Sequence, residues 1–137
     1  MDKVKQFEHF IGERPQFQIF DKTLAQGYTN YSSTFSIEYS GVNFIISIGD
    51  DALTEIICLV STLDLERKDE ILSLINDLNQ IYKAAKYTYD NSGTLKLIMS
   101  YVANDDFFEP PMLFQLVSNA MAIVEEDYKK FTAFTKQ

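Results

Sequence analysis

Few residues of this chain have the side-chain chemistry of a catalytic site. His9 is its only histidine and Cys58 its only cysteine, so a Ser-His-Asp or Cys-His mechanism would have to use one of these two. His9 lies beside the apolar stripe of the first predicted helix, where we expect it to face water. Cys58 lies within the apolar run 56–60, where burial keeps a thiol protonated and unreactive. The sequence therefore predicts a protein without enzymatic activity.

Three groups of acidic residues have the chemistry for metal binding or acid–base catalysis. Asp50-Asp51 and Asp105-Asp106 fall in predicted turns, where acidic side chains form turns and face water. A third group, at 125–127, lies near the end of the last predicted helix, where acids oppose the helix dipole; it could serve a basic partner or form a solvated face. The sequence has no phosphate loop, dinucleotide signature, calcium loop or zinc spacing. We therefore expect no catalytic residue, no metal and no cofactor.

Charge and composition exclude two further classes of partner. The chain carries 20 acidic and 12 basic residues, a net charge of -8. Because its basic residues are scattered, it lacks the basic stripe of a nucleic-acid-binding protein. Its apolar runs, such as 56–60, are far shorter than the roughly 20 residues of a membrane-spanning helix. Residues 1–5 include no apolar stretch of a secretion signal, and a lone cysteine suits a reducing compartment, so we expect a cytoplasmic protein.

The hydrophobic pattern predicts the elements that position these residues. Val4, Phe7 and Ile11 form the apolar stripe of a short helix over 2–11. Strict alternation predicts strands at 31–39 and 42–48, joined by a turn at Ser40-Gly41. Further strands are predicted at 53–63, 85–90 and 94–102, with one helix over 65–83 and a last one opened by prolines 110 and 111. Residues 13–30 allow two interpretations: Phe17, Ile19 and Phe20 form a short strand or anchor a loop.

Strands that follow one another as hairpins predict an α+β fold rather than an alternating α/β fold. We expect one domain over 1–137, with three helices and an antiparallel five-stranded sheet in the order α-β-β-β-α-β-β-α. In a sheet with one wet face each strand should alternate, but the strands at 53–63 and 94–102 do not. This predicts an apolar patch on the second face, used for protein binding or dimerisation, unless the segment 17–20 covers it. The patch residues are Ile45, Ile56, Cys58, Val60, Ile98 and Val102.

The second half of the chain carries a family resemblance. A helix bearing Asn76 and Asn79 precedes the hairpin 86–97, of sequence KYTYDNSGTLKL, and a long amphipathic helix ends the chain. This pattern resembles the YbjN family and is similar to the class I type III secretion chaperone fold. The resemblance implies non-enzymatic dimers that hold an extended segment of another protein on apolar surface. The two asparagines could bind backbone of a neighbouring element or partner, or cap local backbone of their own helix.

Two functional hypotheses follow. The first is a non-enzymatic protein-binding module, an adaptor or chaperone-like domain that acts as a homodimer or binds another protein. The second is a small-molecule-binding or sensory domain whose pocket is lined by some of the 11 phenylalanines and 8 tyrosines.

Overall fold

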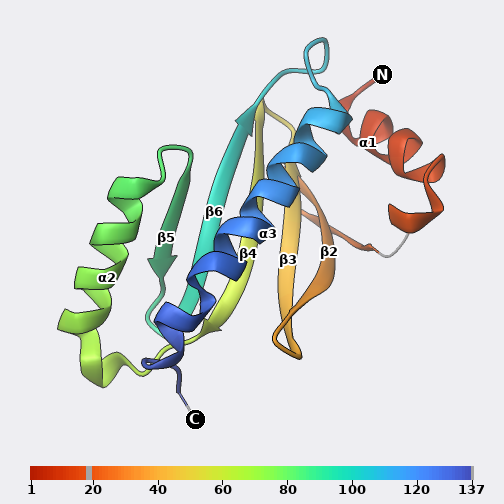
Figure 1. Ribbon diagram of the computed structural model, residues 1–137. Coiled ribbons are helices and arrows are strands. Elements are labelled where there is room, and N and C mark those ends of the chain that lie inside the picture. Colours follow the sequence, from red (N-terminus) through yellow and green to blue (C-terminus); the bar gives the residue numbers. More distant parts are fainter. Residues whose placement is uncertain (18–19, 137) are drawn as a thin grey trace.

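A computed structural model of the chain describes residues 1–17 and 20–136 and shows helices packed on a twisted sheet (Figure 1). Within these residues the sheet has six strands: β1 (Asp21–Ala25), β2 (Tyr28–Ile37), β3 (Ser40–Gly49), β4 (Leu53–Thr62), β5 (Ala85–Tyr89) and β6 (Thr94–Val102). The α-helices are α1 (Lys3–Gly12), α2 (Lys68–Ile81) and α3 (Pro110–Thr132). Two short 3-10 helices, η1 (Pro15–Phe17) and η2 (Leu65–Arg67), precede β1 and α2.

All strand pairs of the sheet are antiparallel, in the order β1-β2-β3-β4-β6-β5. The predicted α+β class with three helices is confirmed, but the prediction of five strands is wrong. The additional strand, β1, lies within residues 13–30, for which the sequence allows either a strand or a loop. Phe17 belongs to η1, Phe20 packs against the core just before β1, and Ile19 lies outside the described residues.

The core lies between one face of the sheet and the helices. Cα partners in register carry Tyr31, Ile46, Ile56, Met99 and Ala85 across five neighbouring strands, and all five residues are buried. In Figure 1, α3 runs diagonally over this face, with α2 beside β5 and α1 at the other end. The buried stripe of α3 contains Leu113, Val117, Ala120, Val124, Asp127 and Phe131.

Helix α1 depends on contacts with the rest of the chain, as its ten residues are too few for a stable isolated helix. The ring of Phe7 is fully buried and lies 4.4 Å from that of Tyr31 and 5.6 Å from that of Phe114, measured between centroids. The Lys3 ammonium is also buried and donates a hydrogen bond to the carbonyl of Asp51. These contacts fix α1 on the β2 side of the sheet.

The hairpin of β2 and β3 turns through two residues that favour other conformations. Ile37 pairs with Ser40, so the turn consists of Glu38 and Tyr39, whose φ angles are 49° and 69°. Two positive φ angles define a type I′ turn, in which asparagine and glycine are preferred. The predicted turn at Ser40-Gly41 is therefore wrong by two residues, because neither Glu38 nor Tyr39 carries the usual signal.

Candidate functional site

The face of the sheet opposite the helices carries apolar side chains at its centre. Ile45 pairs with Ile57, and Ile57 pairs with Ile98, which makes an apolar row across three neighbouring strands. Leu59 follows Ile57 on the same face of β4, and all four side chains are half-buried. We call these four residues the open-face strip. Its neighbours in register and along the strands are polar: Ser32, Asn43, Ser47, Glu55, Lys96 and Ser100.

The structure divides the six predicted patch residues between the two faces. Ile45 and Ile98 belong to the open-face strip, and Val102 lies near its end, pairs with Leu53 and is 72% exposed. Ile56, Cys58 and Val60 are instead at most 5% exposed, on the helix-covered face. The prediction of one shared surface is therefore wrong for these three.

The error has a physical cause in β4. Both faces of this strand are apolar, so its own alternation does not tell which face meets the helices. The hairpin register decides the question, because Ile46 of β3 is buried and pairs with Ile56. Counting that register from the turn at 49–52 would have identified Ile57 and Leu59 as the residues of the open face.

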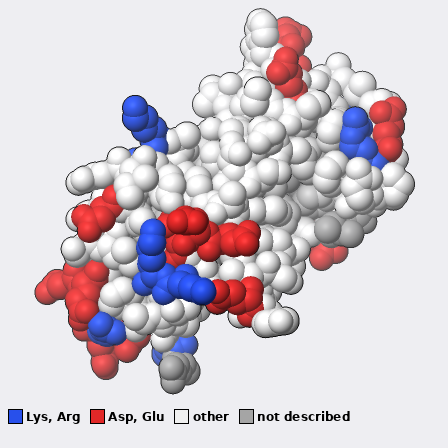
Figure 2. Space-filling view, viewed as in Figure 1, with Lys and Arg blue, Asp and Glu red and all other residues white. Residues whose placement is uncertain are grey.

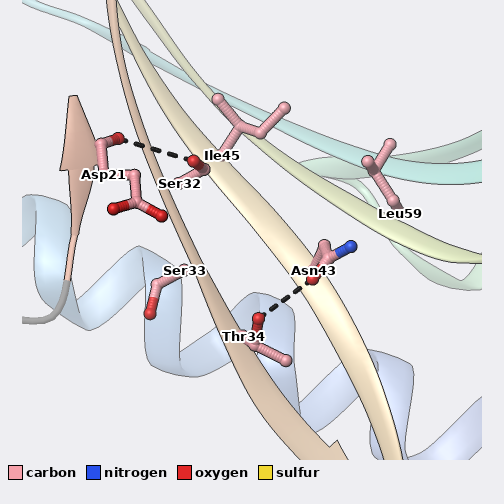
Figure 3. Close-up of a pocket in the computed structure, with 7 residues that line it drawn as sticks. All are labelled: Asp21, Ser32, Ser33, Thr34, Asn43, Ile45 and Leu59. Carbon is pink, nitrogen blue, oxygen red and sulfur yellow. Dashed lines mark hydrogen bonds between the residues drawn. The ribbon is translucent and has the colours of Figure 1, made fainter. Parts of the chain in front are cut away.

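A polar hollow of about 260 Å³ lies at the β1 end of the open face (Figure 3). The Thr34 hydroxyl donates a 2.9 Å hydrogen bond to the side-chain oxygen of Asn43, and the Ser32 hydroxyl lies 3.4 Å from the carbonyl oxygen of Asp21. The Asp21 carboxylate makes no ion pair with any described residue. The residues around the hollow are Asp21, Ser32, Ser33, Thr34, Asn43, Ile45 and Leu59.

An aromatic cleft of about 230 Å³ lies on the helix side of the same region. The rings of Phe17 and Phe114 stack with centroids 4.6 Å apart, and those of Phe20 and Phe44 meet edge to face at 5.9 Å. The cleft lining is completed by Gln16, Thr34, Val117, Ser118 and Met121. The second hypothesis expects a pocket with such a lining, but the volume of this cleft is below the roughly 300 to 1,000 Å³ typical of ligand pockets.

The helix side also has an uncharged surface. Residues 110–124 of α3 include no acidic or basic residue, and Figure 2 shows the charged side chains gathered mainly toward the end of the molecule that holds α2 and the end of α3. A groove of about 510 Å³ lies between α2 and α3, lined in part by Ile81, Met99 and Ile123. The molecule therefore has apolar surface on both sides of its sheet.

The β5 edge of the sheet is closed by a side chain. The Asn79 amide nitrogen donates to the carbonyl of Tyr87 at 3.0 Å, and the Asn79 amide oxygen accepts from the N–H of Tyr87 at 2.8 Å. Asn79 thus binds the backbone of a neighbouring element, while Asn76 is exposed. Lys86 donates from β5 to the carbonyls of Asn79 and Tyr82 at the end of α2.

Asp127 of α3 is the centre of a buried polar network. It is 0% exposed, accepts a 2.8 Å hydrogen bond from the Tyr87 hydroxyl and forms a 3.1 Å ion pair with Lys130. Burial, followed by a hydrogen bond with Asp127, raises the pKa of Tyr82 to about 12. The same two causes raise the pKa of Tyr87. Both tyrosines therefore stay protonated, and the network ties α2, β5 and α3 together.

The residues considered for chemistry lie apart from one another. His9 is exposed and lies 3.2 Å from Glu13, and burial raises the pKa of the Cys58 thiol to about 12. The Asp51 carboxylate accepts from the N–H of Leu53 in the β3–β4 turn, and Asp105 lies in another turn. Over residues 1–17 and 20–136, no group of three or more His, Cys, Asp and Glu side chains could hold a metal ion. No described helix is long and apolar enough to cross a membrane.

The comparisons with known proteins identify a fold and no family. No family model matches the chain, and no curated protein matches its sequence. Among solved structures, a chain in the crystal structure of the ExsC–ExsE complex superimposes with a TM-score of 0.63. The match covers 96% of this chain and 97% of that chain, at 11% sequence identity. This similarity confirms the expected secretion-chaperone fold; membership of the YbjN family remains a prediction.

Proposed function

We propose that the protein is a non-enzymatic, chaperone-like protein-binding module that acts as a homodimer through its open face. The observation that carries this proposal is the open-face strip. No described helix covers this face, and it places Ile45, Ile57 and Ile98 in one row at the centre of a polar frame. Apolar groups grouped in this way are typical of association surfaces. The fold shared with a chain of the ExsC–ExsE complex supports a protein-binding role.

The open face reaches, at most, the extent of a typical dimer interface. Six strands spaced by about 4.8 Å, with central strands of about 33 Å, give a face of at most about 800 Å². A stable protein–protein interface buries about 800 Å² per partner. A second copy is the simplest occupant, because a twofold axis brings the same apolar row of both copies together.

The molar mass in solution, measured by light scattering after size exclusion, tests the homodimer. We expect twice the chain mass of 15.8 kDa for the parent protein. The triple variant Ile45→Thr, Ile57→Thr, Ile98→Thr keeps β-branched residues on the face and should elute at the single-chain mass. Leu24→Thr is the control, since Leu24 is exposed on β1, outside the open-face strip.

A parent protein at the single-chain mass would contradict the homodimer. Binding of a hydrophobic dye then tests the wider proposal. Dye binding that is lost in the triple variant supports an apolar face available to a different protein. A single-chain mass with no dye binding would contradict protein binding through this face.

The aromatic cleft supports a second candidate function, binding of a small flat ligand. Four phenylalanine rings with Val117 and Met121 line it, and such side chains suit an aromatic ligand. Thermal-shift measurements with a set of small aromatic compounds test this function. A stabilisation that disappears in Phe114→Leu supports it, and no stabilisation by any compound counts against it.

A further inference from the structure

One stretch of β2 lacks a partner on its outer side. β1 pairs with β2 only from Tyr28 to Ser32, and its last pair joins Asp21 to Ser32. Beyond that pair, residues 33–37 of β2 pair with β3 on one side and with no described strand on the other. We call residues 33–37 the free edge of β2.

The turn geometry identifies the unpaired backbone groups of this edge. In a two-residue type I′ hairpin the residues that flank the turn form a hydrogen-bonded pair, here Ile37 with Ser40. Hydrogen-bonded pairs recur at every second residue of an antiparallel ladder, so Phe35 and Ser33 also bond to β3. The N–H and C=O groups of Thr34 and Ser36 therefore point away from β3, and both residues are exposed.

Among the described residues, the free edge lacks the charge, the proline and the bulge that often protect a sheet edge. Proteins usually block such edges with lysine, proline, a bulge or a covering segment. Residues 33–37 read Ser-Thr-Phe-Ser-Ile, without charge or proline, and they pair with β3 without a register shift. The opposite edge differs, because Asn79 closes β5 at Tyr87.

We infer that the free edge of β2 is a second binding site, which takes an extended segment of another protein as an added antiparallel strand. Four unpaired backbone groups in line are a template for a strand. This site is distinct from the open-face strip and does not depend on the homodimer. An added strand would turn its side chains alternately to the two faces of the sheet.

The two sides of the free edge differ in chemistry, and this sets the pattern of the partner segment. Thr34 lies between the polar hollow on the open face and the aromatic cleft on the helix side, and it lines both. A residue opposite Thr34 would face the hollow, and the next residue would face Phe20 and Phe44 in the cleft. The segment should therefore alternate polar with apolar residues.

The charge of the site favours basic residues at the polar positions. Asp21 contributes a carboxylate to the hollow, and it has no ion-pair partner among the described residues. The net charge of -8 of the whole chain adds a negative electrostatic potential to that of the Asp21 carboxylate, and this potential attracts basic residues. The structure thus assigns to this edge a segment in which large apolar residues alternate with lysine or arginine.

Labelled decapeptides of alternating valine and lysine, titrated with the full chain and followed by fluorescence anisotropy, test the inference. A peptide with glutamate in place of lysine should bind at least about tenfold more weakly. A second control has the valine–lysine composition in blocks, which keeps the charge but removes the alternation. Asp21→Asn should reduce the preference for the lysine peptide over the glutamate peptide, and Asp77→Asn on α2 should leave this preference unchanged.

Backbone methylation decides whether the peptide adds as a strand. In an antiparallel strand the residues facing the hollow direct their N–H groups to Thr34 and Ser36, so N-methylation of the lysines should weaken binding about tenfold or more. N-methylation of the valines should leave it intact. Ser36→Pro removes one outward N–H of the edge and should weaken binding, whereas Ser36→Ala should not. Equal binding of the two methylated peptides, loss on methylating valine alone, or equal binding of the alternating and blocked peptides would overturn the inference.

Discussion

Replacing Tyr87 by phenylalanine tests whether the buried network around Asp127 holds β5 and α3 together. The change removes the hydroxyl that donates a 2.8 Å hydrogen bond to a fully buried carboxylate. It keeps the ring, which packs 5.0 Å from that of Phe131 between centroids. A hydrogen bond to a charged group contributes about 1.5 to 3 kcal/mol to stability. Because Lys130 remains paired with Asp127, we expect the lower part of this range, a loss of about 1.5 to 2 kcal/mol.

Urea unfolding of the parent protein and the variant, followed by far-UV circular dichroism, measures this loss. Tyr89→Phe is the matched control, since Tyr89 is a half-buried tyrosine of the same strand whose hydroxyl has no hydrogen-bond partner among the described residues. The control should change the free energy of unfolding by no more than about 0.5 kcal/mol. A Tyr87→Phe loss as small as that of the control would refute the argument that the network stabilises the fold.

Three further predictions concern pH, thiol reactivity and the β2–β3 turn. The hydrogen bond with Lys22 is the main cause that lowers the pKa of the Glu8 carboxyl, so the contribution of Glu8 to stability is present above pH 4.5 and is lost as the pH falls through its folded-state pKa. In Glu8→Gln, the free energy of unfolding measured in urea should therefore fall less steeply with decreasing pH than in the parent protein. An unchanged pH profile would contradict this. The Cys58 thiol, with a pKa raised to about 12 by burial, should resist a thiol reagent at pH 8 until the protein is unfolded, and rapid labelling of the folded protein would contradict its burial. Glu38→Asn with Tyr39→Gly should stabilise the protein by about 1 kcal/mol, since the left-handed conformation of these two residues costs ordinary side chains about 1 to 2 kcal/mol each. The double change also removes the exposed ion pair of Glu38 with Lys129, which contributes little to stability. A lower urea midpoint for the double variant would refute this explanation.

The sequence predicted the elements that have a clear period or clear turn chemistry. The stripe of α2 and the hairpin of β5 and β6 are of this kind. In that hairpin the Asp90 carboxylate accepts from the N–H groups of Ser92 and Thr94, and Gly93 has a φ of 86°. Helix α2 begins at Lys68 rather than at the predicted residue 65, because the first turn after Asp64 is 3-10.

The features that the sequence could not predict depend on contacts between strands. Every residue of β1 is exposed, so it has no hydrophobic pattern, and only pairing with β2 makes it a strand. The residues of the open-face strip depend on the register of β3 with β4. Because both faces of β4 are apolar, its sequence does not indicate this register. Asn79 binds the backbone of β5 because α2 packs beside that strand. The spacing of residues along the chain does not predict this packing.

The unequal edges of the sheet also limit how large an assembly can grow. A sheet with two open edges can add strands without end, and this is how fibres form. Here the Asn79 side chain binds the backbone N–H and C=O of Tyr87, the central residue of β5. Strands can therefore be added only at the β2 edge. A segment bound at β2 would complete the sheet, and two copies joined edge to edge at β2 would close on each other. Strand addition within one sheet should therefore stop once the β2 edge is occupied, which keeps the sheet itself from growing without end.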